Sequence, residues 1–182
     1  PSFRGMNILT PTVWNDSVLT STYRNSSFLY RIGEGEAGGF EVEQGWTNEA
    51  QAYMSSPVVV ADTAYMHLGN GRLTAMSLAT GERHWTSKPF GKYWSMVRQG
   101  ERILALDSGG ELILIEASPD ELKVLDQREI SSSETWAYLA VAGDQVVIRE
   151  LNGLTVWRFG DSSAGRSDSP SAVSAASFGS WP

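Results

Sequence analysis

One stretch, residues 57–85, restricts the possible folds more than any other part of the chain. It contains four short apolar or alternating runs separated by turns rich in Gly, Asn and Asp. These residue types accept the positive φ angles of tight turns, so the pattern predicts short antiparallel strands joined by hairpins. A four-stranded meander of this size cannot bury both of its faces alone. It therefore requires neighbouring units of the same kind.

Two landmarks recur along the chain and indicate four copies of this unit. The first is an acidic residue in a turn, and its successive copies lie 46, 39 and 43 residues apart, at Asp16, Asp62, Glu101 and Asp144. The second is a small-residue turn followed by an apolar residue, found 13, 11, 11 and 10 residues after the first landmark. A period of about 40 to 45 residues in a strand-rich sequence is typical of β-propeller blades.

The sequence therefore predicts an all-β fold, a β-propeller of four-stranded antiparallel blades. We expect blades at about residues 8–46, 53–86, 93–130 and 136–160, within a propeller domain that covers residues 1–160. Residues 161–182 are rich in Ser, Ala and Gly and show no strand pattern. They are predicted to form a flexible C-terminal tail, which leaves the fourth blade without an outer strand of its own.

The second predicted blade contains a recognisable spacing. Ala75, Thr80, Gly81 and Trp85 read A-x-x-x-x-T-G-x-x-x-W. This resembles the blade signature of PQQ-like (quinoprotein-type) β-propeller repeats, which BamB-like outer-membrane assembly lipoproteins share, although Ser77 stands where that family usually has Asp. The resemblance implies that Thr-Gly forms the turn between two outer strands and that the Trp packs between adjacent blades. Only this blade carries the whole signature.

PQQ-like propellers usually have seven or eight blades. The resemblance therefore implies a partial propeller, the C-terminal part of a longer chain with further blades upstream of Pro1; a closed four-bladed ring is the alternative. In a partial propeller the first and fourth blades would each expose an apolar face. Missing blades or a second chain are then expected to cover these open blade edges.

Composition excludes several classes of function. A net charge of −7 and a pI near 4.8 argue against a nucleic-acid partner, which requires a basic surface. The absence of cysteine excludes disulfides and thiolate metal sites. No apolar run approaches the ~20 residues of a transmembrane helix.

Two patterns resemble chemical sites but have simpler explanations. Residues 33–38, GEGEAG, satisfy G-x-G-x-x-G, yet a strand-like run follows instead of the helix that a dinucleotide site needs. They predict a loop between strands. His67 and His84 both fall in predicted strands of one blade without a recurrent carboxylate spacing, so no metal site is predicted.

A local reversal of charge marks the candidate binding face. Residues 83–100 contain four basic residues and no acid. In a propeller, the loops between successive blades lie on one face, together with the loop between the two middle strands, and aromatic residues there are typical of binding hot spots. The predicted partner-binding face consists of Lys88, Phe90, Lys92, Tyr93, Trp94, Arg98, Trp136 and Tyr138. The alternative is that these aromatic residues pack at the entry to the inner strands and the basic residues are solvated.

We expect a non-enzymatic scaffold or binding module that presents these loops, at the mouth of the channel, to a protein or polymer partner. The BamB-like resemblance implies a periplasmic or extracellular location. No catalytic residue, cofactor site or metal ligand is predicted.

One alternative is that the chain is part of a PQQ-dependent quinoprotein dehydrogenase. Such an enzyme needs PQQ, calcium held by Glu and Asn, and an Asp base. No position completes such a set, although missing blades could carry one. A second alternative is a carbohydrate-binding propeller.

Overall fold

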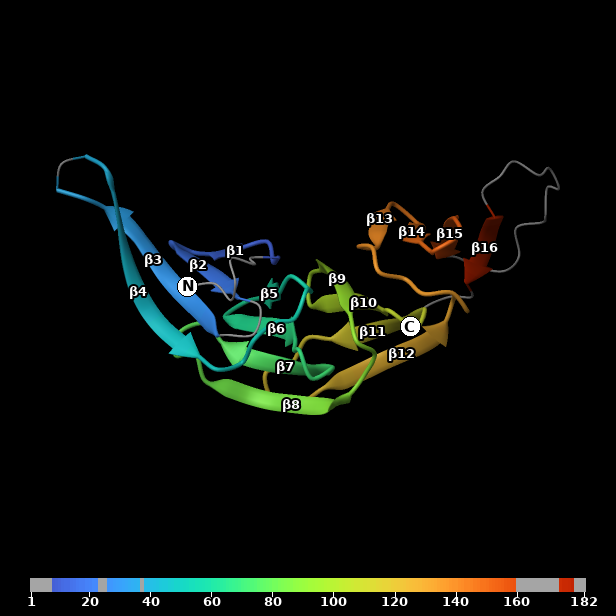
Figure 1. Cartoon of the computed structure of the whole chain (residues 1–182), viewed down its shortest axis with the longest axis horizontal. Helices are drawn as coiled ribbons and strands as arrows, with labels where there is room; N and C mark the ends of the chain where they lie inside the picture. Colours follow the sequence, from blue (N-terminus) through green and yellow to red (C-terminus); the bar gives the residue numbers. More distant parts are fainter. Residues whose placement is uncertain (1–7, 23–25, 37, 160–173, 179–182) are drawn as a thin grey trace. The chain divides into compact units, whose positions relative to one another are not determined.

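The computed structural model describes residues 8–22, 26–36, 38–159 and 174–178, and the backbone alone for the last of these segments. The strands in this part of the chain form four four-stranded sheets, and no helix occurs among the same residues (Figure 1). The predicted all-β fold of four-stranded sheets is confirmed. The chain divides into two compact units, which we describe one at a time.

The first unit comprises residues 1–94 and 117–123 and contains two sheets. The first sheet runs in the order β1 (Thr12–Trp14), β2 (Ser17–Ser21), β3 (Ser27–Glu34) and β4 (Phe40–Asn48). The second runs in the order β5 (Val58–Val60), β6 (Thr63–His67), β7 (Arg72–Ser77) and β8 (Arg83–Pro89). Neighbouring strands pair antiparallel in both sheets, as expected when short turns join them.

One apolar core joins these two sheets. Leu19 and Leu29 lie opposite each other on β2 and β3, so both side chains leave the same face of the first sheet. They belong to one buried cluster with Ala64, Met66 and Leu78 of the second sheet. Burial alternates along β2, where Ser17, Leu19 and Ser21 are buried and the residues between them are half-buried, as expected for a strand with one face in the core.

Tryptophan side chains fix the packing in this unit. The Trp46 indole N–H donates to the carbonyl of Leu78 (2.8 Å), and that of Trp85 donates to the carbonyl of Ser118 (2.9 Å). Trp46 lies over Gly81, which has a φ of 76° in the β7–β8 turn. A Cβ atom at Gly81 would lie 2.5 Å from the indole, so the turn requires glycine here for both conformation and space.

The second unit comprises residues 95–116 and 124–182 and contains the other two sheets. The third sheet is formed by β9 (Trp94–Gln99), β10 (Arg102–Asp107), β11 (Glu111–Glu116) and β12 (Lys123–Glu129). The fourth is formed by β13 (Ala140–Ala142), β14 (Gln145–Arg149), β15 (Leu154–Phe159) and β16 (Ser174–Phe178). Leucine side chains of β10 and β11 form one buried core with Val146 and Ile148 of β14.

The fourth sheet differs from the sequence-based expectation. We predicted that it has no outer strand, because residues 161–182 show no strand pattern. The structure instead places β16 beside β15, in parallel, with Thr155 opposite Ser174 and Phe159 opposite Phe178. The unpaired edge of β15 offers backbone donors and acceptors that a strand of weak intrinsic propensity can satisfy. The remaining residues of the predicted tail, 161–173 and 179–182, lie outside the described residues.

Residues 33–38 form the end of the β3–β4 hairpin. The Gly35 N–H donates to the carbonyl of Gly39 (2.7 Å), and the Gly38 N–H donates to the carbonyl of Gly35 (3.0 Å). Glu34 ends β3 and Phe40 begins β4, so the prediction that this glycine-rich segment connects two strands is confirmed.

Candidate functional site

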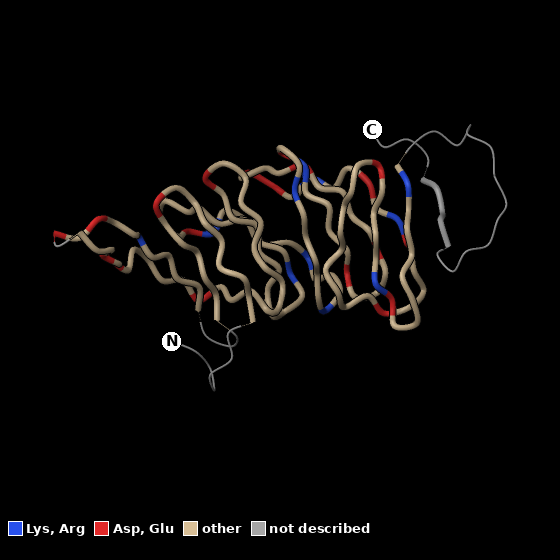
Figure 2. Tube along the Cα trace, turned by 90° about the horizontal axis from the view of Figure 1, so that it is seen from above, with Lys and Arg blue, Asp and Glu red and all other residues tan. Residues whose placement is uncertain are grey.

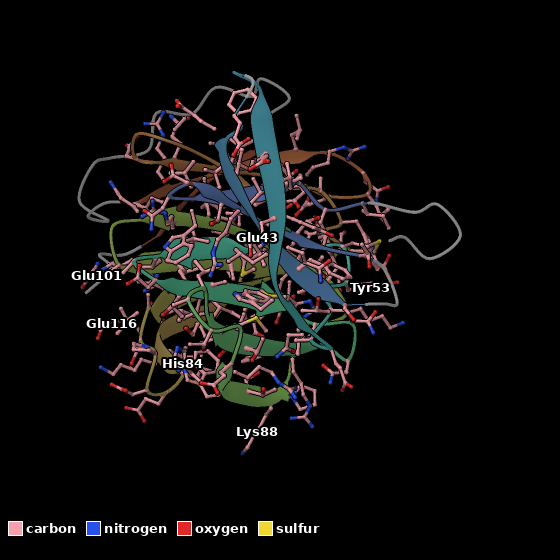
Figure 3. The ribbon with its side chains drawn as sticks, turned by 90° about the vertical axis from the view of Figure 1, so that its left-hand side faces the viewer. Glu43, Tyr53, His84, Lys88, Glu101 and Glu116 are labelled. Atoms are coloured by element: carbon pink, nitrogen blue, oxygen red, sulfur yellow. The ribbon has the colours of Figure 1, made fainter. Side chains whose placement is uncertain are left out.

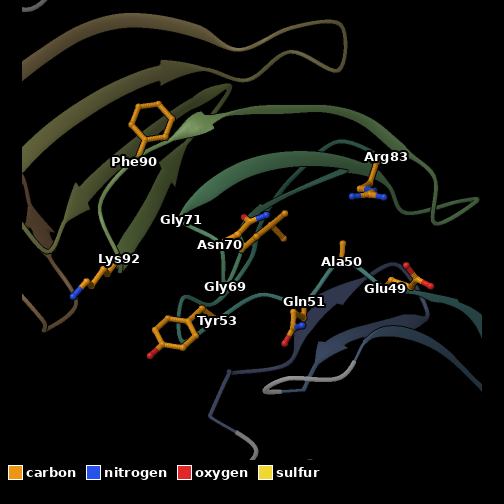
Figure 4. A pocket seen from close by; sticks show the side chains of 11 residues that line it. Glu49, Ala50, Gln51, Tyr53, Gly69, Asn70, Gly71, Arg83, Phe90 and Lys92 are labelled. Atoms are coloured by element: carbon orange, nitrogen blue, oxygen red, sulfur yellow. The ribbon is translucent and has the colours of Figure 1, made fainter.

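A groove in the first unit lies where three connections between strands meet. Its volume is about 740 Å³. Residues 49–53 connect β4 to β5, residues 68–71 connect β6 to β7, and residues 90–92 connect β8 to β9; Arg83 of β8 completes the lining (Figure 4). The loop argument from the sequence predicted that connections of these kinds share a face.

Backbone hydrogen bonds join the three connections to one another. The Gly69 N–H donates to the Gln51 carbonyl (3.3 Å), and the Phe90 N–H donates to the Gly71 carbonyl (2.6 Å). Gly71 has a φ of 75°, and a Cβ atom there would lie 3.1 Å from the Phe90 carbonyl oxygen. The walls of the groove are therefore held by main-chain contacts before any ligand binds.

His67 supports the groove from below. The side chain is fully buried, its Nε2 lies 3.0 Å from the Gly91 carbonyl oxygen, and its ring stacks on Trp94 with centroids 5.3 Å apart. A carbonyl only accepts hydrogen bonds, so Nε2 carries the hydrogen. Burial lowers the pKa of His67 to about 4, against the smaller raising effect of the Gly91 carbonyl. The neutral imidazole thus tethers the 90–92 connection.

The lining changes in character along the groove. Figure 4 shows Arg83 and Glu49 at one end, and Tyr53, Phe90 and Lys92 at the other. The side-chain amides of Gln51 and Asn70 lie between them. Two aromatic rings, two amides and three charged groups spread over an open groove suit an extended ligand of mixed polarity, because each stretch of the ligand meets different chemistry.

Five of the predicted site residues lie in the first unit, and the structure separates them. Phe90 and Lys92 line the groove. Tyr93 and Trp94 are buried, with exposed fractions of 4% and 0%, and Trp94 contacts the Phe90 ring at a centroid distance of 4.7 Å. These two residues support the groove from inside and offer no contact surface, as in the alternative in which they pack at the strand entry. Lys88 is exposed on β8 outside the groove (Figure 3).

The other three predicted residues lie in the second unit. Arg98 is exposed near the end of β9. Trp136 and Tyr138 are 40% and 50% exposed in the connection between β12 and β13. The Trp136 indole N–H donates to the Glu134 carboxylate (3.0 Å). Trp136 and Tyr138 thus form a second, exposed pair of amphipathic aromatic residues, available for contact with a partner.

Several groove residues were absent from the predicted set. They are Glu49, Gln51, Tyr53, Asn70 and Arg83. The signal for Tyr53 and Asn70 was available, because the propeller pattern places their loops on the same face as residues 90–92. The basic segment that marked the face also begins at Arg83.

The acidic and histidine side chains of the described residues are dispersed over the strands and turns. In this part of the chain, no group of three or more His, Asp or Glu side chains is arranged to hold a metal ion. The described residues form no helix with the length and hydropathy that a membrane span requires.

Comparison with known proteins gives a consistent result for the fold. Residues 4–87 match the protein family described as outer membrane protein assembly factor BamB. No curated protein matches the sequence. Among solved structures, the chain is similar to BamB from Moraxella catarrhalis, with a TM-score of 0.63 and 17% identity over 82% of this chain and 43% of that one.

Two other solved structures extend the comparison. The computationally designed Ika4 protein has a TM-score of 0.59 and 10% identity over 87% of this chain and 97% of its own. The β-propeller domain of Myceliophteria thermophila Cps50 (Swd1) has a TM-score of 0.61 and 14% identity over 80% of this chain and 54% of that one. At such identities the similarity concerns the fold alone. The chain spans less than half the length of the Moraxella BamB.

Proposed function

Because residues 4–87 match the BamB assembly-factor family and the chain shares the fold of a β-propeller, we propose that it is a non-enzymatic binding module that presents its loop face to a protein or polymer partner. The observation that carries the proposal is the groove between the three connections of the first unit. Its walls are joined by main-chain hydrogen bonds, so little conformational entropy is lost when a ligand binds. Its lining offers aromatic, amide and charged groups in succession.

A protein is the partner that we favour, in the periplasm or outside the cell. The matching family is described as an assembly factor for outer membrane proteins, which supports a role in contacts between proteins. Phe90 and Tyr53 supply flat contact area, and Lys92 and Arg83 supply charge that orients a partner.

We also propose that the four sheets are part of a larger propeller of seven or eight blades. The chain covers 43% of the Moraxella BamB, and Val13 on the first sheet is 71% exposed. Leu154 on the fourth sheet is 54% exposed. Further sheets, from a longer polypeptide or from a second chain, would cover these apolar positions.

Site-specific photo-crosslinking tests the binding role. A crosslinking residue at Lys92 or Tyr53, introduced in cells, should capture one polypeptide, whereas the same residue at Lys88 outside the groove should not. The captured protein, once purified, should bind the wild-type chain saturably, and Lys92→Glu should weaken that binding about tenfold or more. Lys88→Glu is the matched control.

Three outcomes would contradict the proposal. Equal capture from positions 88 and 92, with an intact far-ultraviolet spectrum of each variant, would show that the groove is not a binding site. Calcium-dependent quinone absorbance after reconstitution with PQQ would instead support a quinoprotein. Saturable binding of a glycan and of no peptide would support the carbohydrate-binding alternative.

A further inference from the structure

The outer hairpin of the first sheet is longer than its equivalents in the second and third sheets. In the second sheet the last antiparallel pair, Thr63 with Ser77, is followed by the bond from the Leu78 N–H to the Asp62 carbonyl (2.9 Å), and the β7–β8 turn begins there. In the third sheet β11 ends at the same level, at Glu116 opposite Arg102. Neither sheet continues its outer hairpin beyond this point.

The first sheet continues for three more residue pairs. The equivalent bond runs from the Ile32 N–H to the carbonyl of Asp16 (2.8 Å). Beyond it, Ile32 pairs with Val42, Gly33 with Glu41 and Glu34 with Phe40. These pairs extend the hairpin by about 10 Å, and Figure 1 shows β3 and β4 reaching past β1 and β2. We call residues 32–36 and 38–43 the arm.

The arm is not required to complete the sheet, because the second and third sheets form without it. Insertions into one repeat of a repeat protein concentrate in the loops that bind partners. The arm carries apolar and acidic side chains, and both kinds support such a role.

Large apolar side chains share one side of the arm. Ile32 and Val42 are a cross-strand pair, and Phe40 lies two residues from Val42 on the same side of β4. Their exposed fractions are 37%, 65% and 85%. Leu78, at the level of Ile32 in the second sheet, is fully buried. Three adjacent apolar side chains in water form a contact surface that a partner can cover with a gain in free energy.

Carboxylates lie on both sides of the arm. Glu34 pairs with Phe40 on the apolar side, whereas Glu41 and Glu43 alternate with Phe40 and Val42 along β4 and lie on the other side. Four glutamates lie in the arm, with Arg31 at its base, and Figure 2 shows the acidic residues at this end of the first unit. They are Glu34, Glu36, Glu41 and Glu43, all exposed. This charge opposes pairing of two arms face to face, because like charges would be brought together. It favours a partner that carries positive charge.

We propose that the arm is a docking element for a basic polypeptide segment. The aliphatic or aromatic side chains of that segment cover Ile32, Phe40 and Val42. Its long lysine or arginine side chains approach Glu34 on the same side and, past the edge strand β4, Glu41 and Glu43. This surface is separate from the groove, so the first unit has two contact sites of opposite character: a groove that contains basic residues and an acidic arm.

Titration with model peptides tests the proposal. The probe is a short synthetic peptide that alternates lysine and valine, and the comparison peptide replaces each lysine by glutamate. The lysine peptide should shift the backbone amide resonances of the arm saturably, and the glutamate peptide should not. The double variant Phe40→Ser/Val42→Ser should weaken binding about tenfold or more, and Glu41→Lys/Glu43→Lys should weaken it and increase its salt tolerance.

Two control variants keep the result specific. Leu154→Ser removes an exposed apolar side chain of the second unit and should leave binding unchanged. Lys92→Glu should also leave it unchanged, so that failure of the groove and failure of the arm are distinguishable. Each variant's fold is checked by circular dichroism, and all substituted arm residues are exposed, so the fold should persist.

Three results of the titration would overturn the proposal, and a fourth result comes from sedimentation. They are the absence of saturable shifts in the arm, equal binding of the two peptides, and equal binding by wild type and by Phe40→Ser/Val42→Ser. Dimerisation in sedimentation experiments that the same double variant abolishes would also overturn it, since the arm would then contact a second copy of the chain.

Discussion

At the scale of single residues, His67 shows how one buried side chain organises a surface site. The imidazole donates to the Gly91 carbonyl and stacks on Trp94, so it joins β6 to the connection that carries Phe90 and Lys92. Protonation would place a charge in this buried position. The groove therefore depends on a histidine that no ligand needs to touch.

The pH dependence of stability should report this histidine. The folded pKa of about 4 lies below the ordinary value of 6.5, so the unfolded chain binds the proton first as the pH falls. Stability should decline as the pH drops from about 6.5 through about 4, by up to about 3 kcal/mol in all. Urea unfolding of His67→Gln, which retains an amide donor, should show a smaller decline than wild type. His84→Gln, an exposed control, should behave as wild type does.

The second prediction at this scale concerns the effect of a substitution at Gly81 on stability. Gly81→Ala places a methyl group 2.5 Å from Trp46 in a backbone with a φ of 76°. We expect a loss of about 2–4 kcal/mol, because left-handed strain adds to displacement of the indole from the Leu78 carbonyl. Gly100→Ala has a φ of 59° with open space around it and should lose about 1 kcal/mol. Equal losses in chemical denaturation would show that the Trp46 contact contributes nothing.

At the scale of elements, β16 is the strand whose contribution is easiest to isolate. It pairs in parallel with β15, although residues 160–173 separate the two in the sequence. Backbone pairing of this kind protects the partner's amides from solvent.

Truncation after Phe159 should therefore expose the outer edge of β15. Amide hydrogen exchange of residues 155–159 should accelerate, while that of β10 and β11 changes little. Removal of residues 179–182 alone should leave the exchange of β15 as in the full chain. Unchanged protection of β15 after the longer truncation would show that β16 does not stabilise the fourth sheet.

At the scale of the molecule, serial sheets should behave as a nearly one-dimensional array, in which each unit depends on its immediate neighbours. Leu106→Ala removes a buried side chain from the core of the second unit and should cost about 2–5 kcal/mol there. Hydrogen exchange should accelerate in β10, β11 and β14 and remain slow in β2 and β3. Acceleration of equal size in β2 and β3 would indicate one cooperative body instead.

The sequence was sufficient for the sheets and for the loops that meet at the groove. Turn residues such as Gly71 and Gly81 mark the hairpins, and the spacing of the copies places like loops on one face. The sequence was insufficient to predict that Trp94 is buried, because the local pattern around an aromatic residue at the start of a strand is the same whether its side chain is exposed or buried. The residue that covers it, His67, lies on another strand.

The same reasoning explains why β16 was missed. A Ser- and Ala-rich segment has little strand propensity, and its pairing depends on the open edge of β15, which only the folded sheet provides. The arm was predicted only in part. Its glycine-rich end was correctly predicted to be a loop. Nothing in residues 33–38 indicated that β3 and β4 are longer than the equivalent strands of the second and third sheets. That difference emerges only from the pairing register.

The tryptophan contacts have an evolutionary consequence. Trp46 and Trp85 both donate to carbonyl oxygens of the main chain, at Leu78 and Ser118. Every residue type has a peptide carbonyl, so mutation of the side chain at the accepting residue does not remove the acceptor. The sequence of the accepting turn can therefore diverge while the hydrogen bond from the tryptophan is kept. Lineages of such modules can consequently lose almost all recognisable similarity and retain their architecture, which accords with identities of 14–17% to natural proteins of the same fold.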